Sequence, residues 1–184
     1  ERLAESLYAL RILDKEGRAF VLDDKGKVLV DVAHGWFDSA YGYEELFHSL
    51  EGMLRKEQRY GEDVNRRAPY IARGTGNMEK LIYFPLAIDM IEAQGATHVL
   101  DLGCGDAIFL RELCAHLPTV TGYGLDIAED TIEEGRAAVR DGGLTDRVHL
   151  FIEDVTRVER LPAPLERIEV ATIFFVLHEV LYQG

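Results

Sequence analysis

The chain has 184 residues, enough for one domain or for one domain with a small appendage. It has 20 Lys and Arg against 33 Asp and Glu. The resulting formal net charge of −13 disfavours nucleic acid as a partner, because phosphate binding needs clustered cations. The chain has no apolar run of the roughly eighteen residues that a membrane span needs, so we expect no membrane association. The two cysteines, Cys104 and Cys114, are not spaced for a zinc site or a disulfide scaffold, and we expect a cytoplasmic protein.

Residues 1–68 predict a region of helices with one hairpin. Leucines recur at three- and four-residue spacing from Leu3 to Leu13, which indicates an amphipathic helix that ends near Gly17. Two β-prone runs, 19–22 and 28–30, flank the polar segment 23–27 and predict a hairpin. A second helical pattern follows over residues 43–60. Helix and hairpin together are compatible with a winged-helix-like unit.

Residues 69–95 predict a connecting loop and a helix. Two glycines with Thr and Asn indicate a loop over residues 68–77, and Arg73 lies within it. A helix is expected over residues 78–93, kinked at Pro85 and closed by Gly95.

Residues 96–184 alternate between strand and helix patterns, which predicts an α/β, Rossmann-like fold with a parallel sheet. The expected strands cover residues 98–102, 121–127, 148–152 and 168–177, and the expected helices cover residues 107–117 and 129–140.

The stretch from Thr97 to Ala107 joins a buried strand to a helix through the turn Gly103-Cys104-Gly105. Glycines let a ligand approach the backbone closely, and the helix that follows offers unpaired N–H groups. Asp126 ends the next strand, where a carboxylate can take both hydroxyls of a ribose. An NAD-dependent oxidoreductase also needs such an acid. However, Ala107 stands in the region of the third glycine of the dinucleotide fingerprint, which disfavours that function.

Four motifs, VLDLGCGDA, YGLDIA, FIEDV and ATIFFVLHEV, follow one another from residue 99 to residue 180. In this order they resemble the motif series of class I S-adenosylmethionine (SAM)-dependent methyltransferases. The resemblance implies SAM as cofactor and a set of SAM-binding residues, namely Asp101, Gly103, Gly105, Asp126, Ile127, Asp154, Val155 and Phe175. Glu153 competes with Asp154 for one of these roles. A full fold of this kind has three further strands, so we expect its C-terminal part to be absent from this chain.

The resemblance also suggests a small-metabolite substrate. The VLHEV ending is similar to small-molecule O-methyltransferases, in which His178 would be the general base. It is also similar to C-methyltransferases of α-keto acids, some of which use such a pair, here His178 and Glu179, to hold a divalent or ferric metal ion. The stretch YIARGTG favours the keto-acid group. Arg73 could then clamp a carboxylate of SAM or of the substrate.

Small-molecule methyltransferases that the chain resembles use an N-terminal helical region to form dimers and to cover the substrate. We therefore expect residues 1–68 to make a homodimer contact or a cap. A SAM-binding or dimerisation module without catalytic activity is the remaining alternative.

Overall fold

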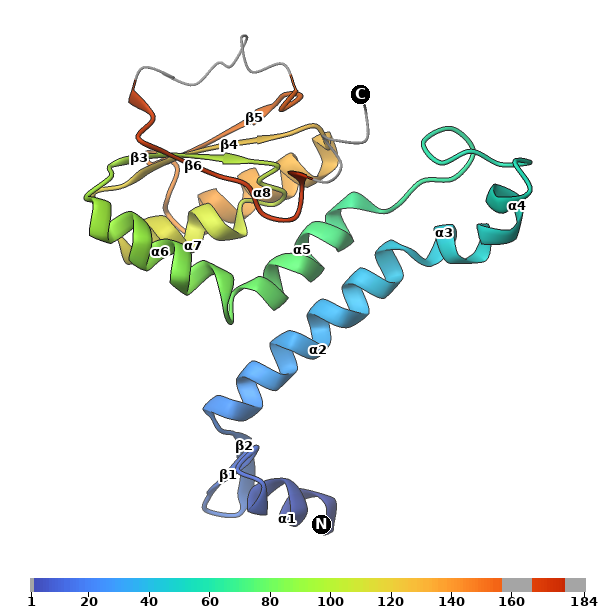
Figure 1. Ribbon diagram of the computed structural model, residues 1–184. Helices are drawn as coiled ribbons and strands as arrows, with labels where there is room; N and C mark the ends of the chain where they lie inside the picture. Colours follow the sequence, from blue (N-terminus) through green and yellow to red (C-terminus); the bar gives the residue numbers. More distant parts are fainter. Residues whose placement is uncertain (1, 157–166, 178–184) are drawn as a thin grey trace.

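The computed structural model describes residues 2–156 and 167–177, and it begins with an arm that extends away from the rest of the molecule (Figure 1). The arm contains α1 (Arg2–Ala9), the antiparallel strands β1 (Leu13–Glu16) and β2 (Ala19–Leu22), and the long helix α2 (Asp24–Gly42). Gly17, with φ of 64°, makes the tight turn between the two strands.

The sequence prediction for this arm was partly wrong. The hairpin covers residues 13–22 and not residues 19–30, because the polar segment from Asp23 begins a helix. The carboxylate of Asp23 accepts a hydrogen bond from the backbone N–H of Gly26 at 2.6 Å and caps α2. The pattern over residues 43–60 forms only two short helices, α3 (Glu44–His48) and α4 (Leu50–Leu54).

The expected loop over residues 68–77 is also wrong, since these residues form α5 (Ala68–Glu79). The glycines of this helix permit close packing against other elements. A Cβ atom added at Gly74 would lie 2.8 Å from the carbonyl oxygen of Gly35, and one added at Gly76 would overlap Ile108. Helices α2 and α5 therefore lie side by side (Figure 1).

The next helix, α6 (Tyr83–Gln94), starts later than predicted. Pro85 lies in its first turn, where the missing N–H breaks no hydrogen bond, so the expected kink is absent there. Gly95 closes the helix with a left-handed conformation, as predicted.

The sheet has four described parallel strands in the order β5-β4-β3-β6. They are β3 (His98–Leu102), β4 (Thr121–Asp126), β5 (Val148–Ile152) and β6 (Val170–Thr172), with the helices α7 (Ile108–His116) and α8 (Glu129–Asp141) between the first three. Strands β4 and β5 lie on one side of β3, and β6 pairs with its other side. This order confirms the predicted Rossmann-like fold.

The fourth strand is shorter than predicted. Only residues 170–172 pair with β3, and Phe175 has a positive φ of 54° that is incompatible with a continuing strand. The apolar run therefore leaves the sheet and turns toward the end where β3 stops.

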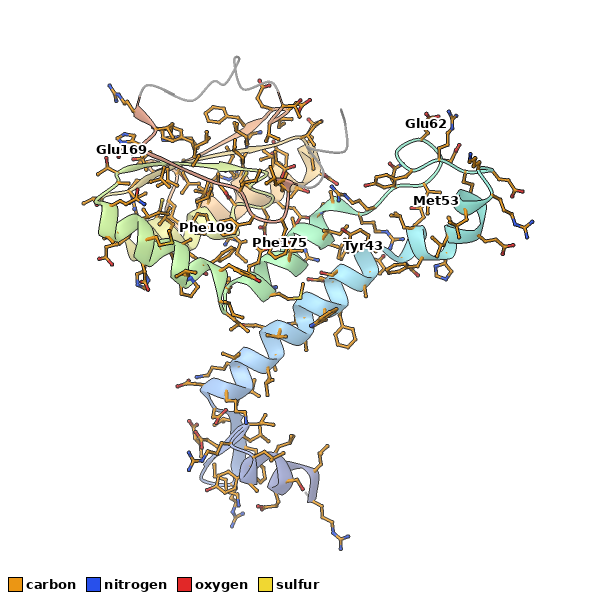
Figure 2. The ribbon with its side chains drawn as sticks, viewed as in Figure 1. Tyr43, Met53, Glu62, Phe109, Glu169 and Phe175 are labelled. Carbon is orange, nitrogen blue, oxygen red and sulfur yellow. The ribbon has the colours of Figure 1, made fainter. Side chains whose placement is uncertain are left out.

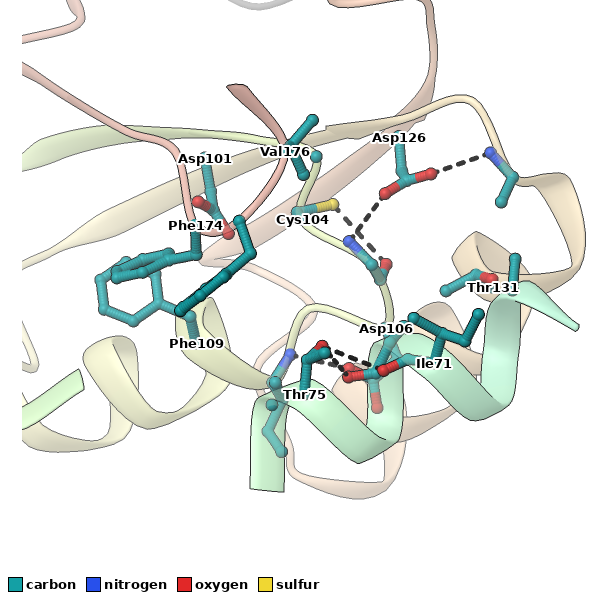
Figure 3. Close-up of a pocket in the computed structure, with 18 of the residues that line it drawn as sticks. Ile71, Thr75, Asp101, Cys104, Asp106, Phe109, Asp126, Thr131, Phe174 and Val176 are labelled. Atoms are coloured by element: carbon teal, nitrogen blue, oxygen red, sulfur yellow. Dashed lines mark hydrogen bonds between the residues drawn. The ribbon is translucent and has the colours of Figure 1, made fainter. Parts of the chain in front are cut away.

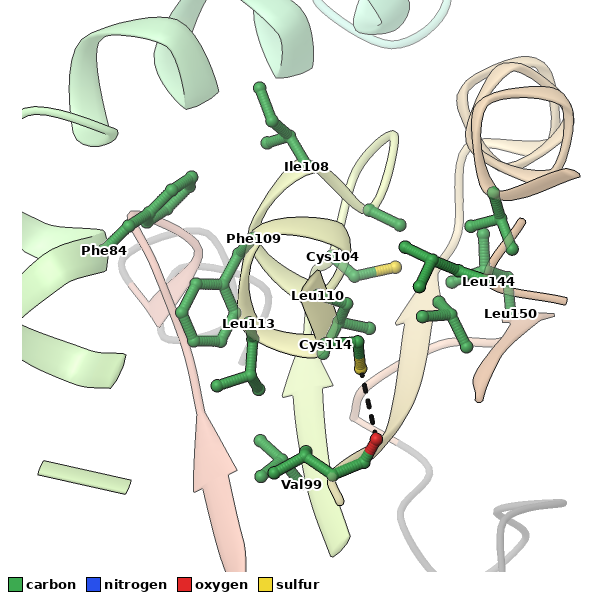
Figure 4. Close-up of a cluster of buried hydrophobic side chains, with 14 of the residues drawn as sticks. Phe84, Val99, Cys104, Ile108, Phe109, Leu110, Leu113, Cys114, Leu144 and Leu150 are labelled. Carbon is green, nitrogen blue, oxygen red and sulfur yellow. Dashed lines mark hydrogen bonds between the residues drawn. The ribbon is translucent and has the colours of Figure 1, made fainter. Parts of the chain in front are cut away.

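Side chains alternate between the two faces of the sheet. One face packs against α6, α7 and α8 in a large core, where Phe84, Phe109 and Leu110 gather beside Val99 (Figure 4). The other face carries a smaller cluster around Leu100, Tyr123 and Leu125. The larger core holds the glycine turn after β3 in place. None of the described helices is both long and apolar enough to span a lipid bilayer.

Candidate functional site

A cavity of about 300 Å³ opens at the carboxyl ends of the strands. Its walls come from the segments that follow β3, β4, β5 and β6, and α5 closes one side (Figure 3). In open α/β sheets, ligands bind at this edge, where the strand order reverses. Glu169 lies at the opposite edge of the sheet from Phe175 (Figure 2), and its carboxylate accepts hydrogen bonds from the backbone of Thr97 and His98.

The glycine turn forms the floor of the cavity. Gly103 and Gly105 have φ values of 74° and 55°, which favour glycine strongly. A Cβ at Gly103 would overlap the side chain of Val176, and one at Gly105 would lie 2.9 Å from the Cβ of Ala72. The structure therefore places both predicted glycines in the cavity wall and explains why larger residues do not fit.

Asp126 joins the turn to the end of β4. One oxygen of its carboxylate accepts from the N–H of Gly105 at 3.0 Å, and the other accepts from the N–H of Ala128 at 2.9 Å (Figure 3). Each carboxylate oxygen has a second lone pair, so both can still accept a hydrogen bond from a ligand. This arrangement suits recognition of two neighbouring hydroxyl groups.

Asp101, predicted to act near the turn, is buried in the wall and accepts a hydrogen bond from the hydroxyl of Thr172 at 2.7 Å. Burial raises the pKa of Asp101 to about 7, and the nearby carboxylate of Glu79 adds to this shift. Asp106, at the start of the next helix, is also buried, and burial raises its pKa while Arg111 opposes the shift. The inner end of the cavity is therefore acidic.

The sequence predictions at the end of β5 agree with the position of the cavity. Asp154 and Val155 line it, whereas Glu153 is not among its lining residues. Asp154 accepts hydrogen bonds from both the backbone and the hydroxyl of Thr156. Ile127, 71% exposed, lines the same region and offers an apolar surface to a planar group.

Two neighbouring phenylalanines behave differently. Phe174 packs against Phe84 and Phe109 with ring centroids 5.3 and 4.7 Å apart, so it belongs largely to the core. Phe175 is 58% exposed and contacts the ring of Tyr83 edge-on. Both line the cavity.

Arg73 lies elsewhere than the sequence suggested. It is a helical residue of α5, and its guanidinium donates to Asp38 of α2 at 2.7 and 3.3 Å. Glu134 of α8 is 3.6 Å away, and the ring of Tyr70 lies beneath the guanidinium. Arg73 is not among the residues that line the cavity. It connects α2, α5 and α8.

Several lining residues were missed from the sequence, namely Tyr43, Arg66, Thr75, Glu79, Asp106 and Thr131. Ala72, Gly76 and Glu79 are spaced four and three residues apart, which puts them on one face of a helix. That signal is visible only once residues 68–79 are recognised as helical. Among the described lining residues, Arg66 is the only Lys or Arg.

The candidate catalytic and metal-binding residues His178 and Glu179 lie outside the described residues. Within residues 2–156 and 167–177, no three His, Cys, Asp or Glu side chains are grouped to hold a metal ion.

Comparison with known proteins agrees with this geometry. Residues 99–183 match the family described as a methyltransferase domain. The 2-ketoarginine methyltransferase of Streptomyces arginensis is 28% identical over 172 residues, which are 91% of this chain and 47% of that protein. The methyltransferase ungE′ of Aspergillus campestris is 29% identical over 141 residues, 73% of this chain and 40% of that protein.

Solved structures share the fold. The apo structure of the SAM-dependent methyltransferase SibL superposes with a TM-score of 0.53 at 18% identity, covering 96% of this chain and 56% of that one. Mitomycin 7-O-methyltransferase MmcR superposes with a TM-score of 0.51 at 21% identity, covering 97% of this chain and 56% of that one. The chain thus spans about half the length of these relatives.

The parallel sheet, its reversal of strand order and the glycine turn below the cavity define a class I methyltransferase fold. Residues 99–183 are similar to the methyltransferase-domain family, and the chain shares its fold with solved SAM-dependent methyltransferases.

Proposed function

We propose that the cavity at the carboxyl ends of β3, β4 and β5 binds SAM and that the protein transfers its methyl group to a small metabolite. One observation carries the proposal: three successive strand ends each bring a backbone turn or a carboxylate to the same cavity. SAM carries an ammonium group, a sulfonium and ribose hydroxyls. The acidic lining of this cavity matches these groups in charge and in hydrogen bonding.

Different residues would bind different parts of the cofactor. Gly103 and Gly105 would lie against the methionine part, and Asp126 would accept hydrogen bonds from the ribose hydroxyls. Asp154 would accept from the adenine amino group. The backbone N–H of Val155 would donate to the ring. Ile127 and Phe175 would supply apolar contacts. When bound, SAM supplies an electrophilic methyl group.

For the acceptor, we propose an α-keto acid that is methylated on the carbon next to its carbonyl. The identity with a 2-ketoarginine methyltransferase supports this substrate class. His178 would take the proton from that carbon, or would hold a metal ion together with Glu179. Arg66 lines the cavity and is therefore better placed than Arg73 to bind a substrate carboxylate.

The test is methyl transfer from labelled SAM to a panel of α-keto acids that includes 2-ketoarginine. A matched panel of phenols and alcohols reports O-methylation. We expect a C-methylated keto acid and loss of activity in His178→Ala. Full activity after removal of metal would assign His178 as a base without a metal ion. Label found only in methyl ethers would overturn the keto-acid proposal in favour of the O-methyltransferase.

We also propose that residues 1–68 form a homodimer contact and that residues 96–184 bind the methyl donor SAM. Residues 69–95 would connect these two regions. The arm and the short helices after it expose many large apolar side chains, namely Leu3, Leu10, Val28, Leu29, Trp36, Phe37, Phe47, Leu50 and Leu54. Apolar surface of this extent commonly marks a protein interface. Cys104 and Cys114 are free thiols, which is compatible with the cytoplasm that we propose as the location.

A further inference from the structure

Glu79, the last residue of α5, is a buried carboxylate that has no cationic partner among residues 2–156 and 167–177. Only 7% of the residue is exposed, and it lines the cavity. Within the described part of the chain, its side chain makes no hydrogen bond and no ion pair. The adjacent Lys80 pairs instead with Glu112 at 3.0 Å.

Such a side chain is unfavourable when the cavity holds no ligand. A buried charge normally has a partner or loses its charge, and burial alone raises the pKa of Glu79 to about 7. The carboxylate of Glu79 also adds to the raised pKa of Asp101, so the two carboxylates lie near each other. A Leu or Met would fill the same space without that penalty. The two carboxylates are therefore best explained by a positively charged group that enters the cavity.

The two carboxylates suit an ammonium group, because both can accept hydrogen bonds from its N–H donors. Asp101 already accepts a hydrogen bond from Thr172, which leaves acceptor positions on its carboxylate and on that of Glu79. An ammonium group has three N–H donors and can bridge two carboxylates. Asp101 lies two residues before Gly103, so the pair borders the turn assigned above to the methionine part of SAM.

We propose that Glu79 is a donor-binding residue whose carboxylate, together with that of Asp101, binds the ammonium group of the methionine part of SAM. This inference rests on the proposed function, since it places one group of the same cofactor. Helix α5 then contributes directly to cofactor binding. The arm packs on this helix through α2, so the donor site and the arm share one structural element.

The experiment compares two ligands that share an adenosine part. S-adenosylhomocysteine carries the ammonium group, and 5′-methylthioadenosine lacks the amino-acid part altogether. Binding of both is measured by calorimetry for the wild type, Glu79→Gln and the control Glu92→Gln, which changes an exposed acid on α6. We expect Glu79→Gln to weaken the binding of S-adenosylhomocysteine at least about tenfold, in line with loss of a charged hydrogen bond. The affinity for methylthioadenosine should stay unchanged.

Other outcomes would overturn the inference. If the binding of both ligands weakens equally, Glu79 only shapes the cavity. If the binding of neither ligand weakens, Glu79 does not bind the ammonium group. If the wild type binds neither ligand, the proposed function itself fails. Glu79→Leu is a second variant with an apolar side chain of similar size, and we expect it to discriminate between the ligands in the same way.

Discussion

The carboxylate of Asp126 accepts a hydrogen bond at 3.0 Å from the backbone N–H of Gly105, a residue 21 positions earlier in the chain. The bond joins the ends of β3 and β4 and fixes the glycine turn against the acid that we assign to the ribose. The two features that first indicated a nucleotide-type ligand are thus parts of one site (Figure 3).

The stability of the ligand-free protein should fall as the pH rises toward neutrality. The pKa values of Glu79 and Asp101 are raised from 4.5 and 3.8 to about 7 each. The folded state therefore holds protons that the unfolded state releases, so this stabilisation is complete below about pH 4 and is lost as the pH rises through 7. From pH 5.5 to pH 8, Glu79 alone should account for roughly 2 kcal/mol of the loss.

Urea unfolding at these two pH values measures the effect. Glu79→Gln cannot ionise, so its free energy of unfolding should change less with pH than that of the wild type and should exceed it at pH 8. The same pH dependence in both proteins would show that Glu79 does not hold a proton in the folded state.

Packing between α2 and α5 should depend on Gly74. A Cβ there would lie 2.8 Å from both the carbonyl oxygen of Gly35 and the backbone nitrogen of Ser39, which are fixed backbone atoms. Gly74→Ala should therefore lower the free energy of unfolding by about 1–3 kcal/mol, as overpacking does. In the control Gly52→Ala, the new methyl group meets only the flexible end of Gln58, so stability should stay level or rise. A thermal melt that shows equal stability for both variants would contradict this account of the packing.

The exposed apolar surface of the arm should mediate self-association. Trp36 and Phe37 are 65% and 73% exposed on α2. Replacing both with Glu should convert a dimer into a monomer, because it places charges in an apolar contact. Sedimentation equilibrium measures the mass of the particle in solution and so distinguishes a dimer from a monomer. A wild-type monomer at the concentrations where the protein is active would contradict the proposed homodimer.

The strands and helices around the site could be predicted well from the sequence. The expected ranges for β3, β4, β5, α7 and α8 agree with the structure to within one or two residues. Apolar runs that end in glycine or an acid are strong local signals, since a buried parallel strand and its following turn leave few alternatives. The same signals placed Gly103, Gly105, Asp126 and Asp154 in the cavity.

The arm and α5 could not be predicted, because tertiary packing decided them. Val28, Leu29 and Val30 favour a strand locally, yet they lie in the long helix that Asp23 caps. Gly74 and Gly76 favour a loop, yet they are the residues that let α5 approach its neighbours. Arg73 and Glu79 both lie on α5. Because a loop was expected there, Arg73 was proposed as a site residue and Glu79 was not, although Glu79 lines the cavity and Arg73 does not.

The most direct test of the central claim is a calorimetric titration of the protein with S-adenosylhomocysteine. The account predicts one site for each chain. It also predicts that Asp126→Ala weakens binding by about 1.5–3 kcal/mol through loss of charged hydrogen bonds, while the exposed control Asp141→Ala leaves it unchanged. Unchanged affinity in Asp126→Ala would remove this residue from the site. Absence of any binding to the wild type, or tighter binding of NAD, would contradict the assignment of the cavity to SAM.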